Sequence, residues 1–237
     1  MKPRSLKAIA LLLEYPSAEL IGHIDELEAV ISDEPVLCDC GASLLMPFYQ
    51  YLRHSDAYLL EENYVALFDR GRGTSLYLFE HVHGDSKDRG QAMVDLLKMY
   101  DASGFDLDES ELPDYLPVFL EYLSLLEENQ AVNLLREISH LIRVIGENLA
   151  QRGSHYYLLC SAALLLAGEA ALNVPFIARD FGNEPEDFEQ IDKAWEEAPV
   201  TFGGACDQNQ SNMQSEAIVQ FVKKQVTTGA LEGIEGI

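Results

Sequence analysis

Helical periodicity of the apolar residues runs through most of this chain and constrains its fold more than any other feature. Leu6, Ile9 and Leu13 recur at the spacing that places side chains on one face of an α-helix. Residues 154–172 are apolar nearly all round, which is typical of a helix in the centre of a domain. No run alternates apolar and polar residues with the period of a half-buried strand. The sequence therefore predicts an all-α fold, a single-domain bundle of about eight to ten helices.

Turn and cap residues divide the chain into the expected helices. Pro16 ends the first helix, because a proline disfavours the helical conformation of the residue before it. Ser17 is the expected N-cap of the second helix, and Pro113 is expected in the first turn of a later one, where a proline is tolerated. The expected helices span about residues 6–14, 17–31, 44–54, 55–68, 74–81, 85–100, 113–126, 135–149 and 154–172.

The composition changes toward the C-terminus. Residues 183–197 hold seven acidic residues and one lysine, with Phe188, Ile191 and Trp195 at helical spacing. From about Pro199 the chain is rich in glycine, glutamine, asparagine and threonine, and only residues 218–222 form an apolar patch. Such a composition cannot bury enough apolar surface to order itself. We expect an all-α domain over residues 1–198 and a flexible polar tail over residues 199–237.

The charge balance limits the classes of partner. The chain has 16 basic and 40 acidic residues, for a net charge of -24. A surface this negative repels nucleic acid phosphates and anionic lipid headgroups. It favours cationic partners and accelerates their encounter in a salt-dependent way. We therefore expect no nucleic-acid role and no direct membrane insertion.

Neither the hydrophobic runs nor the cysteines indicate export. Residues 5–13 are apolar, but Glu14-Tyr15-Pro16 follows them instead of a small-residue cleavage site. The most apolar run covers residues 158–167, about half a membrane span. The cysteines have no framework spacing and are expected to be reduced, as in cytosolic proteins: Cys38, Cys40, Cys160 and Cys206. The expected location is the cytoplasm.

Polar chemistry concentrates in residues 64–100. In an acidic chain this block gathers four basic residues, two histidines and four glycines: Arg70, Arg72, Lys87, Arg89, His81, His83, Gly71, Gly73, Gly84 and Gly90. Arg70-Gly71-Arg72-Gly73-Thr74 could bind an anion. The favoured interpretation is internal pairing of Arg70, Arg72 and Arg89 with Asp69, Glu80, Asp85 or Asp88. In this interpretation His81 and His83 hydrogen-bond the loop backbone and shape a binding surface.

A metal site is the alternative interpretation of the same block. His81, His83, Asp85 and Asp88 could serve a helical metal-dependent phosphohydrolase. Histidines two residues apart point in different directions on a helix, however, whereas a helical metal pair uses a spacing of four. The chain also has no GxSxG or HExxH motif and no cysteine with a histidine partner close in sequence. We therefore expect a protein that is not an enzyme and has no metal site.

Five motifs lie between residue 11 and about residue 125: Tyr64-x-x-Leu67-Phe68-Asp69-Arg70-Gly71-Arg72, Leu78-Phe79-Glu80-His81-Val82-His83-Gly84, Asp88-Arg89-Gly90-Gln91-Ala92-Met93, Leu12-Leu13-Glu14-Tyr15-Pro16, and Glu111-Leu112-Pro113-Asp114 before Leu120-Glu121-Tyr122-Leu123. In these motifs the chain resembles the nitrate reductase molybdenum cofactor assembly chaperones, the NarJ or delta-subunit family, which are related to chaperones that bind twin-arginine leader peptides. Beyond residue 125 only Trp195-Glu196-Glu197 adds to the resemblance.

The resemblance implies a groove for the N-terminal peptide of a client protein. The Tyr-x-x-Leu-Phe helix and the Pro-Asp segment line that groove in the family. Many relatives have histidine after this Pro-Asp, whereas this chain has Tyr115, which can still donate and accept a hydrogen bond. The client-binding residues predicted on this basis are Tyr64, Leu67, Phe68, Arg70, Arg72, Glu80, His81, His83, Asp88, Arg89, Pro113, Asp114 and Tyr115.

The function implied by the resemblance is that of a dedicated chaperone. It would bind the apo catalytic (alpha) subunit of respiratory nitrate reductase, assist insertion of the molybdenum cofactor, and delay membrane docking until the enzyme is mature. It would bind no cofactor stably, and proteins of molybdenum cofactor biosynthesis would be further partners. The acidic balance agrees, because a basic, amphipathic leader peptide would meet carboxylates such as Asp114 and place apolar residues in a helix-lined groove.

Overall fold

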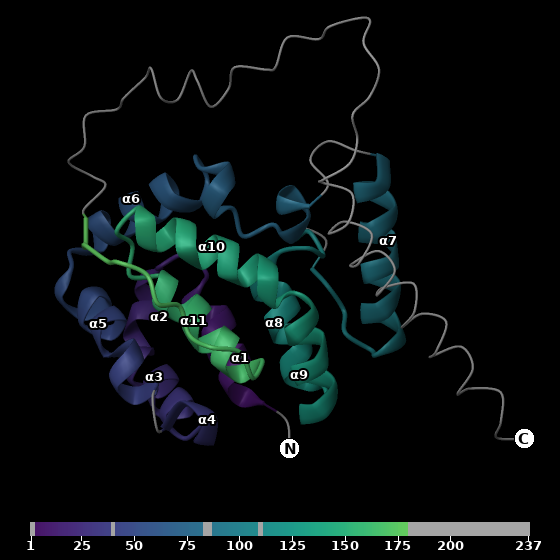
Figure 1. Cartoon of the computed structure of the whole chain (residues 1–237), viewed down its shortest axis with the longest axis horizontal. Helices are drawn as coiled ribbons and strands as arrows, with labels where there is room; N and C mark the ends of the chain where they lie inside the picture. The colour runs from purple at the N-terminus through teal and green to yellow at the C-terminus, as the bar shows by residue number, and fades with distance from the viewer. Residues whose placement is uncertain (1–2, 39–40, 83–86, 109–110, 180–237) are drawn as a thin grey trace, which may run out of the picture.

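The computed structural model describes residues 3–38, 41–82, 87–108 and 111–179, and for Cys38, residues 41–43, Lys87 and Asp88 it describes the backbone alone. Within these ranges every named element is helical, and the one β-type pairing is an isolated bridge between Tyr77 and Tyr115. The all-α prediction is confirmed (Figure 1). The helices are α1 Arg4–Leu12, α2 Ala18–Gly22, α3 Ile24–Ser32, α4 Pro35–Cys38, α5 Gly41–His54, α6 Ala57–Phe68, η1 Arg72–Thr74, η2 Leu78–His81, α7 Lys87–Ala102, α8 Leu116–Leu125, α9 Glu128–Glu137, α10 Ser139–Gln151 and α11 Tyr157–Leu166.

Helix α11 lies at the centre of the bundle. Eight of its ten residues are buried, and it contacts α1, α4, α5, α9 and α10. Figure 1 shows it enclosed by these helices, while α7 lies at the edge beyond α8 and α9. The structure agrees with the prediction that residues 154–172 contain a deeply buried helix. A helix without a polar face is stable only when neighbouring helices cover every side of it. The helix itself is shorter than predicted.

Two predicted helices are each divided by a single residue. His23 separates α2 from α3, and Ile138 separates α9 from α10. Both residues have φ near -100° and ψ near zero, outside the regular α-helical range, with φ/ψ of -105°/11° and -94°/2°. The spacing of the apolar residues continues across such a break, so periodicity alone predicts one continuous helix in place of two. The predicted N-cap is confirmed: Leu20 N donates to Ser17 Oγ at 3.2 Å.

The connector between α6 and α7 differs most from prediction. Instead of one helix over residues 74–81, residues 75–77 run extended between the 3₁₀ turns η1 and η2. Their backbone pairs with the segment before α8: Leu78 N donates to Asp114 O at 2.9 Å, and Leu116 N donates to Leu76 O at 2.8 Å. This pairing requires an extended chain, and it also explains why α8 begins at Leu116 with Pro117 in its first turn, rather than at Pro113.

The last described segment, residues 167–179, runs without regular structure along α10 and α11 (Figure 1). Arginines of the neighbouring helices hold its backbone: Arg136 Nε donates to Ala167 O and Arg143 Nη2 donates to Ala170 O, both at 3.2 Å. The predicted domain boundary at residues 198 and 199 and the predicted polar tail lie outside the described residues, as do Cys206 and residues 183–197.

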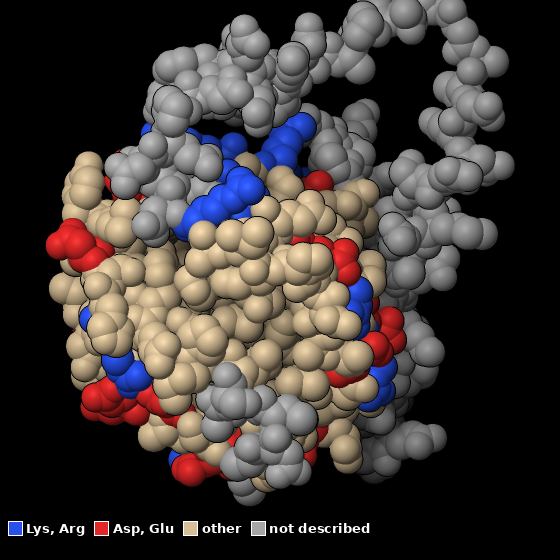
Figure 2. Space-filling view, turned by 60° about the vertical axis from the view of Figure 1, so that its left-hand side comes forward, with Lys and Arg blue, Asp and Glu red and all other residues tan. Residues whose placement is uncertain are grey.

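Charge is distributed unevenly over the surface. Figure 2 shows a face whose centre is occupied by uncharged residues, with acidic and basic side chains toward its edges. Among the described helices, none is both long enough and apolar enough to cross a bilayer.

Candidate functional site

One cavity of the described residues is an open groove of about 580 Å³. It lies between the end of α1, the end of α6, the connector, residues 105–108, Glu111 and the start of α8. Its lining consists of six carboxylates, six aromatic rings and three aliphatic side chains, and no lysine or arginine is among these described lining residues: Glu14, Asp69, Asp106, Asp108, Glu111 and Glu121; Tyr15, Tyr64, Phe68, Tyr77, Phe105 and Tyr115; Leu76, Leu107 and Val118. We call it the acidic groove.

Tyr64 is the centre of the aromatic part of this lining. Its hydroxyl donates to Leu13 O at 2.9 Å and lies 3.2 Å from the hydroxyl of Tyr115. Its ring lies 4.7 Å from that of Phe68 and meets Tyr15 edge to face at 5.5 Å. Such ring pairs stabilise a fixed arrangement beyond their buried area. The floor of the groove is thus built by α1, α6 and the residue before α8.

The phenols of the floor stay uncharged. Burial raises the pKa of Tyr115 to about 12. Burial also raises the pKa of Tyr64, and the neighbouring phenol of Tyr115 raises it further. Tyr115 lies against Tyr77, with ring centroids 5.2 Å apart. These groups can therefore exchange hydrogen bonds with a peptide backbone and present apolar ring surface to its side chains.

The carboxylates give the groove its preference for positive charge. The pKa of the Glu14 carboxyl is raised, first by burial and then by the nearby charges of Glu121 and Glu111. Lys7 acts in the opposite direction, and its Nζ lies 2.7 Å from Glu121 Oε1. A carboxyl whose pKa is raised by like charges is stabilised when a cation arrives. The groove can hold a guanidinium or ammonium group here.

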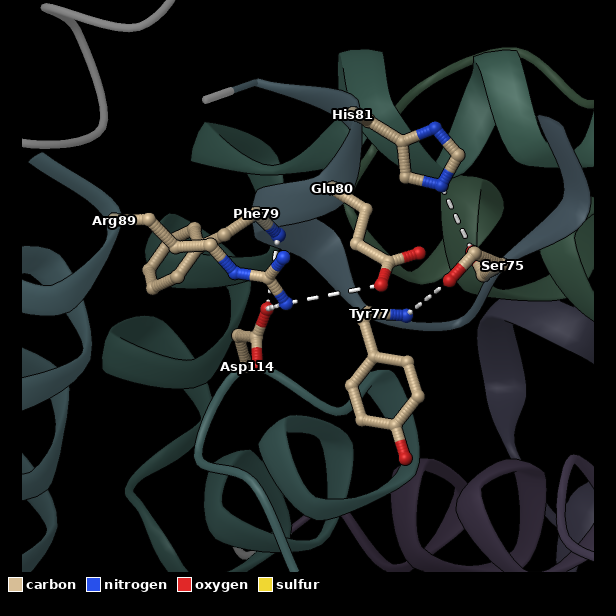
Figure 3. Close-up of polar contacts among 7 residues, drawn as sticks. All are labelled: Ser75, Tyr77, Phe79, Glu80, His81, Arg89 and Asp114. Carbon is tan, nitrogen blue, oxygen red and sulfur yellow. Dashed lines mark hydrogen bonds and ion pairs between the residues drawn. The ribbon is translucent and has the colours of Figure 1, made fainter. Parts of the chain in front are cut away.

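Asp114 lies beneath the groove and does not line it. Its side chain is fully buried; Oδ2 accepts a hydrogen bond from Phe79 N at 3.1 Å and lies 3.8 Å from Arg89 Nη2. Figure 3 shows the Arg89 guanidinium between the carboxylates of Asp114 and Glu80, and its distance to Glu80 Oε1 is 3.7 Å. Burial raises the pKa of Asp114, while Phe79 N–H and Arg89 lower it. The Oδ1 atom has no hydrogen-bond partner among the described residues.

This polar network fixes the connector against α8. Tyr100 Oη donates to Pro113 O at 2.8 Å, directly before Asp114. On the connector, His81 Nε2 lies 2.8 Å from Ser75 O, and Tyr77 N donates to Ser75 Oγ at 3.3 Å (Figure 3). The prediction that His81 hydrogen-bonds the loop backbone is confirmed. Asp114 and His81 therefore hold in place the segments that carry Tyr77 and Tyr115.

The predicted client-binding residues divide into five groups. Tyr64, Phe68 and Tyr115 line the acidic groove. Leu67, Pro113 and Asp114 are buried, and Glu80, His81 and Arg89 belong to the polar network, of which Arg89 with Glu80 is one of the expected internal pairs. Arg70 and Arg72 are exposed outside the groove. His83 and the side chain of Asp88 lie outside the described residues. Client contact by these residues remains a prediction.

Sequence reasoning missed most of the carboxylates that line the groove. Asp106, Asp108 and Glu111 come from the loop after α7, and Glu121 comes from α8. Acidic residues alternate with Phe105 and Leu107 directly after Gly104, which is a local signal for a loop that presents both kinds of side chain. Glu14 and Tyr15 stand in a recognised motif, but no feature of the sequence placed them beside Tyr64.

The metal alternative gains no site in the part of the chain that the structure describes. No group of three or more histidine, cysteine, aspartate or glutamate residues is arranged there to hold a metal ion. The Nε2 atom of His81 is engaged with Ser75 O. His83, Asp85 and the side chain of Asp88 fall outside the described residues.

Comparison with known proteins identifies the family. The family model described as "Nitrate reductase delta subunit" matches residues 40–160. The chain belongs to this family. The matched residues include every described lining residue of the acidic groove except Glu14 and Tyr15. The two residues outside the match come from the turn after α1, which packs against α6 through Tyr64.

Curated relatives of this chain are assembly chaperones by name. "Probable nitrate reductase molybdenum cofactor assembly chaperone NarW" of Escherichia coli (strain K12) is 40% identical over 93% of this chain and 94% of its own length. NarJ of the same strain, "Nitrate reductase molybdenum cofactor assembly chaperone", is 41% identical over 83% of this chain and 84% of the relative. A probable NarJ of Bacillus subtilis (strain 168) is 28% identical over 64% of this chain and 82% of the relative. None of these three names describes a catalyst.

Proposed function

We propose that this protein is a non-catalytic chaperone that serves the catalytic subunit of respiratory nitrate reductase in the cytoplasm. Family membership and the names of the relatives support the chaperone role. The observation that carries the proposal further is the acidic groove, which combines aromatic rings with six carboxylates and no cationic lining residue among those described. This is a surface for a peptide that is both apolar and positively charged.

The proposed ligand of the groove is the N-terminal, leader-like peptide of the client. Basic side chains of the peptide would lie against Glu14, Glu111 and Glu121, and its apolar side chains would pack on Tyr64, Phe68 and Tyr115. Amphipathic helices bind hydrophobic grooves through anchors spaced along one face. The basic side chains of the peptide would also be attracted to the faces of the aromatic rings in the groove. Both contributions are needed, because charge gives the encounter rate and orientation whereas buried anchors give most of the affinity.

Asp114 contributes to this site by positioning its neighbours. Because its carboxylate is fully buried, it supports the groove through Phe79 N–H and Arg89 instead of meeting the peptide. Arg89 and Glu80 would serve in the same way, by holding η2 against the segment before α8. Leu67 contributes to the packing beneath the groove, since it is buried in the core on the same helix as Tyr64 and Phe68.

The chaperone would act by binding one state of its client. A ligand that prefers the cofactor-free conformation shifts the client toward that conformation and loses affinity when the cofactor packs in. The protein would thereby assist insertion of the molybdenum cofactor, delay membrane docking and leave the mature enzyme, without holding the cofactor stably itself. Contact with proteins of molybdenum cofactor biosynthesis belongs to the same proposal.

The state preference is tested on the client itself. We expect the immobilised chaperone to retain the cofactor-free catalytic subunit and to release or reject the cofactor-filled subunit at equal concentration. A 1.4 kcal/mol difference in binding free energy is a tenfold difference in affinity, so the preference should exceed about tenfold to act as a switch. Equal affinities for the two forms would contradict the proposed mechanism while leaving leader recognition intact.

Peptide binding in the acidic groove should depend on pH through Glu14. The pKa of Glu14 is raised in the free protein by burial, Glu121 and Glu111, and a bound cation would lower it again by favouring the charged form. The complex then holds fewer protons than the free protein, so affinity should rise with pH and be lost as pH falls through the raised pKa. Titrations at several pH values should show this slope, and Glu14→Gln should flatten it. If the affinity of Glu14→Gln depends on pH as steeply as that of the wild-type protein, a group other than Glu14 releases the proton on binding.

A further inference from the structure

A second groove lies on another part of the bundle, between α1, α3 and the end of α8. Its volume is about 410 Å³. Its described lining is aliphatic apart from two basic residues and one hydroxyl, and it contains no acidic residue: Arg4, Lys7, Ala8, Leu11, Leu27, Val30, Ser124 and Leu125. Leu125 is 44% exposed at its edge. We call it the α1–α3–α8 groove, and it leaves apolar surface of three helices open to solvent.

The charge of this groove is opposite to that of the chain. The protein has a net charge of -24 and only 16 basic residues, yet both charged residues that line this groove are cations, Arg4 and Lys7, of which Lys7 also pairs with Glu121. In the acidic groove the charged residues among the described lining are all carboxylates. A segment that is both apolar and negatively charged would be repelled by the acidic groove and attracted by the α1–α3–α8 groove.

The chain contains such a segment. Residues 183–197, which lie outside the described residues, carry seven acidic residues and one lysine. Their apolar residues Phe188, Ile191 and Trp195 recur at i, i+3 and i+7, so a helix would present them on one face. We propose that residues 183–197 dock as an acidic amphipathic helix in the α1–α3–α8 groove of the same chain, with the three apolar side chains against the aliphatic lining and the carboxylates toward Arg4 and Lys7. This inference does not depend on leader recognition.

The described chain ends beside the turn that follows α10. Arg179 N donates to Gly153 O, next to Arg152, and Arg152 Nη1 contacts Leu67 O of α6 at 3.4 Å. The hydroxyl of Tyr64, one turn earlier in α6, donates to Leu13 O after α1. The end of the described chain is thus linked to α6 through Gly153 and Arg152, and the end of α1 is linked to it through Tyr64. Residues 180–187 can span roughly 26–29 Å when extended, and Leu11 of the groove precedes Leu13 by two residues.

The chain provides its own reporter for this contact, because Trp195 is its single tryptophan. In the full-length protein we expect Trp195 emission that lies to the blue of a free tryptophan amide in the same buffer and resists quenching by acrylamide. Leu125→Asp places a carboxylate in the groove and should shift the emission to the red and restore quenching. Arg4→Glu should act in the same direction, and more strongly at low salt than at high salt.

Val144→Asp is the matched control for Leu125→Asp. Val144 is 46% exposed on α10 and does not line the groove, so it introduces the same charge on a similarly exposed aliphatic residue. It should leave Trp195 emission unchanged. Helical content measured by circular dichroism on each variant separates loss of docking from loss of folding.

Three results would overturn the proposal. Trp195 emission equal to that of the free amide in the wild-type protein would mean that the segment does not dock. Protected emission that both groove variants leave unchanged would place the segment elsewhere. Protection that disappears on dilution would mean that a second copy of the chain, not the same chain, supplies the segment. Titration with the leader peptide is a separate measurement, so failure here leaves the proposed function intact.

Discussion

Reversing the charge of Glu111 should weaken binding of the client's leader peptide by at least about tenfold. Glu111 lines the acidic groove and contributes to the raised pKa of Glu14. Glu111→Lys removes one attractive charge and places a cation where a basic side chain of the peptide would lie. Calorimetric titration of the variant with the leader peptide measures the loss, which should diminish at high salt because the interacting charges are partly exposed to solvent.

Glu137→Lys is the matched control for this variant. Glu137 is exposed on α9 and does not line the groove, so its reversal changes the net charge of the protein by the same amount. Its affinity for the peptide should stay close to that of the wild-type protein. If both reversals weaken binding equally, the peptide responds to the overall charge of the protein, and the acidic groove is not its site.

Replacing Tyr64 by alanine should lower the free energy of unfolding by about 3–5 kcal/mol, the range found when large aromatic residues are truncated in a core. The ring is 6% exposed and packs against Tyr15, Phe68 and Tyr156. Tyr64→Phe keeps the ring and loses only the hydroxyl that donates to Leu13 O. The cost of that change should be about 1–2 kcal/mol, because one buried carbonyl loses its partner. Denaturant unfolding of the two variants measures both values.

The difference between the two variants separates packing from hydrogen bonding at the floor of the groove. Equal losses of stability would mean that the ring contributes little and that the hydroxyl network fixes the end of α1 against α6. For peptide binding Tyr64→Phe is the informative variant, since it retains the apolar surface of the groove. An alanine variant that loses binding together with stability would not show where the peptide lies.

Helices were predictable from the sequence where their buried side chains follow a regular spacing within the helix itself. Periodicity located α6 and α7 and the buried character of α11, because each of these helices presents a regular apolar face or is apolar all round. It did not reveal the extended residues 75–77, whose conformation depends on hydrogen bonds to Asp114 and Leu116, almost 40 residues away in the chain. The two one-residue breaks in long helices were also missed, because the apolar period continues through them.

The site was predictable in part for similar reasons. Tyr64 and Phe68 are four residues apart on α6, and both reach the groove, but Leu67 between them turns into the core. Asp114 was expected to meet a cationic peptide, whereas its depth makes it a support for the connector. The described carboxylates that do line the groove come from separate parts of the chain, namely residues 14, 69, 106 with 108 and 111, and 121. Only the fold brings them together.

The most direct test of leader recognition by the acidic groove is calorimetric titration of the full-length protein with the N-terminal peptide of its nitrate reductase catalytic subunit, beside a scrambled peptide of equal charge. Saturable binding of one peptide per chain, selective for the native order and lost in Glu111→Lys, is the predicted result. Equal binding of the two peptides would reduce the groove to nonspecific attraction of positive charge. Absence of binding to either peptide would contradict leader recognition and place the client contact elsewhere.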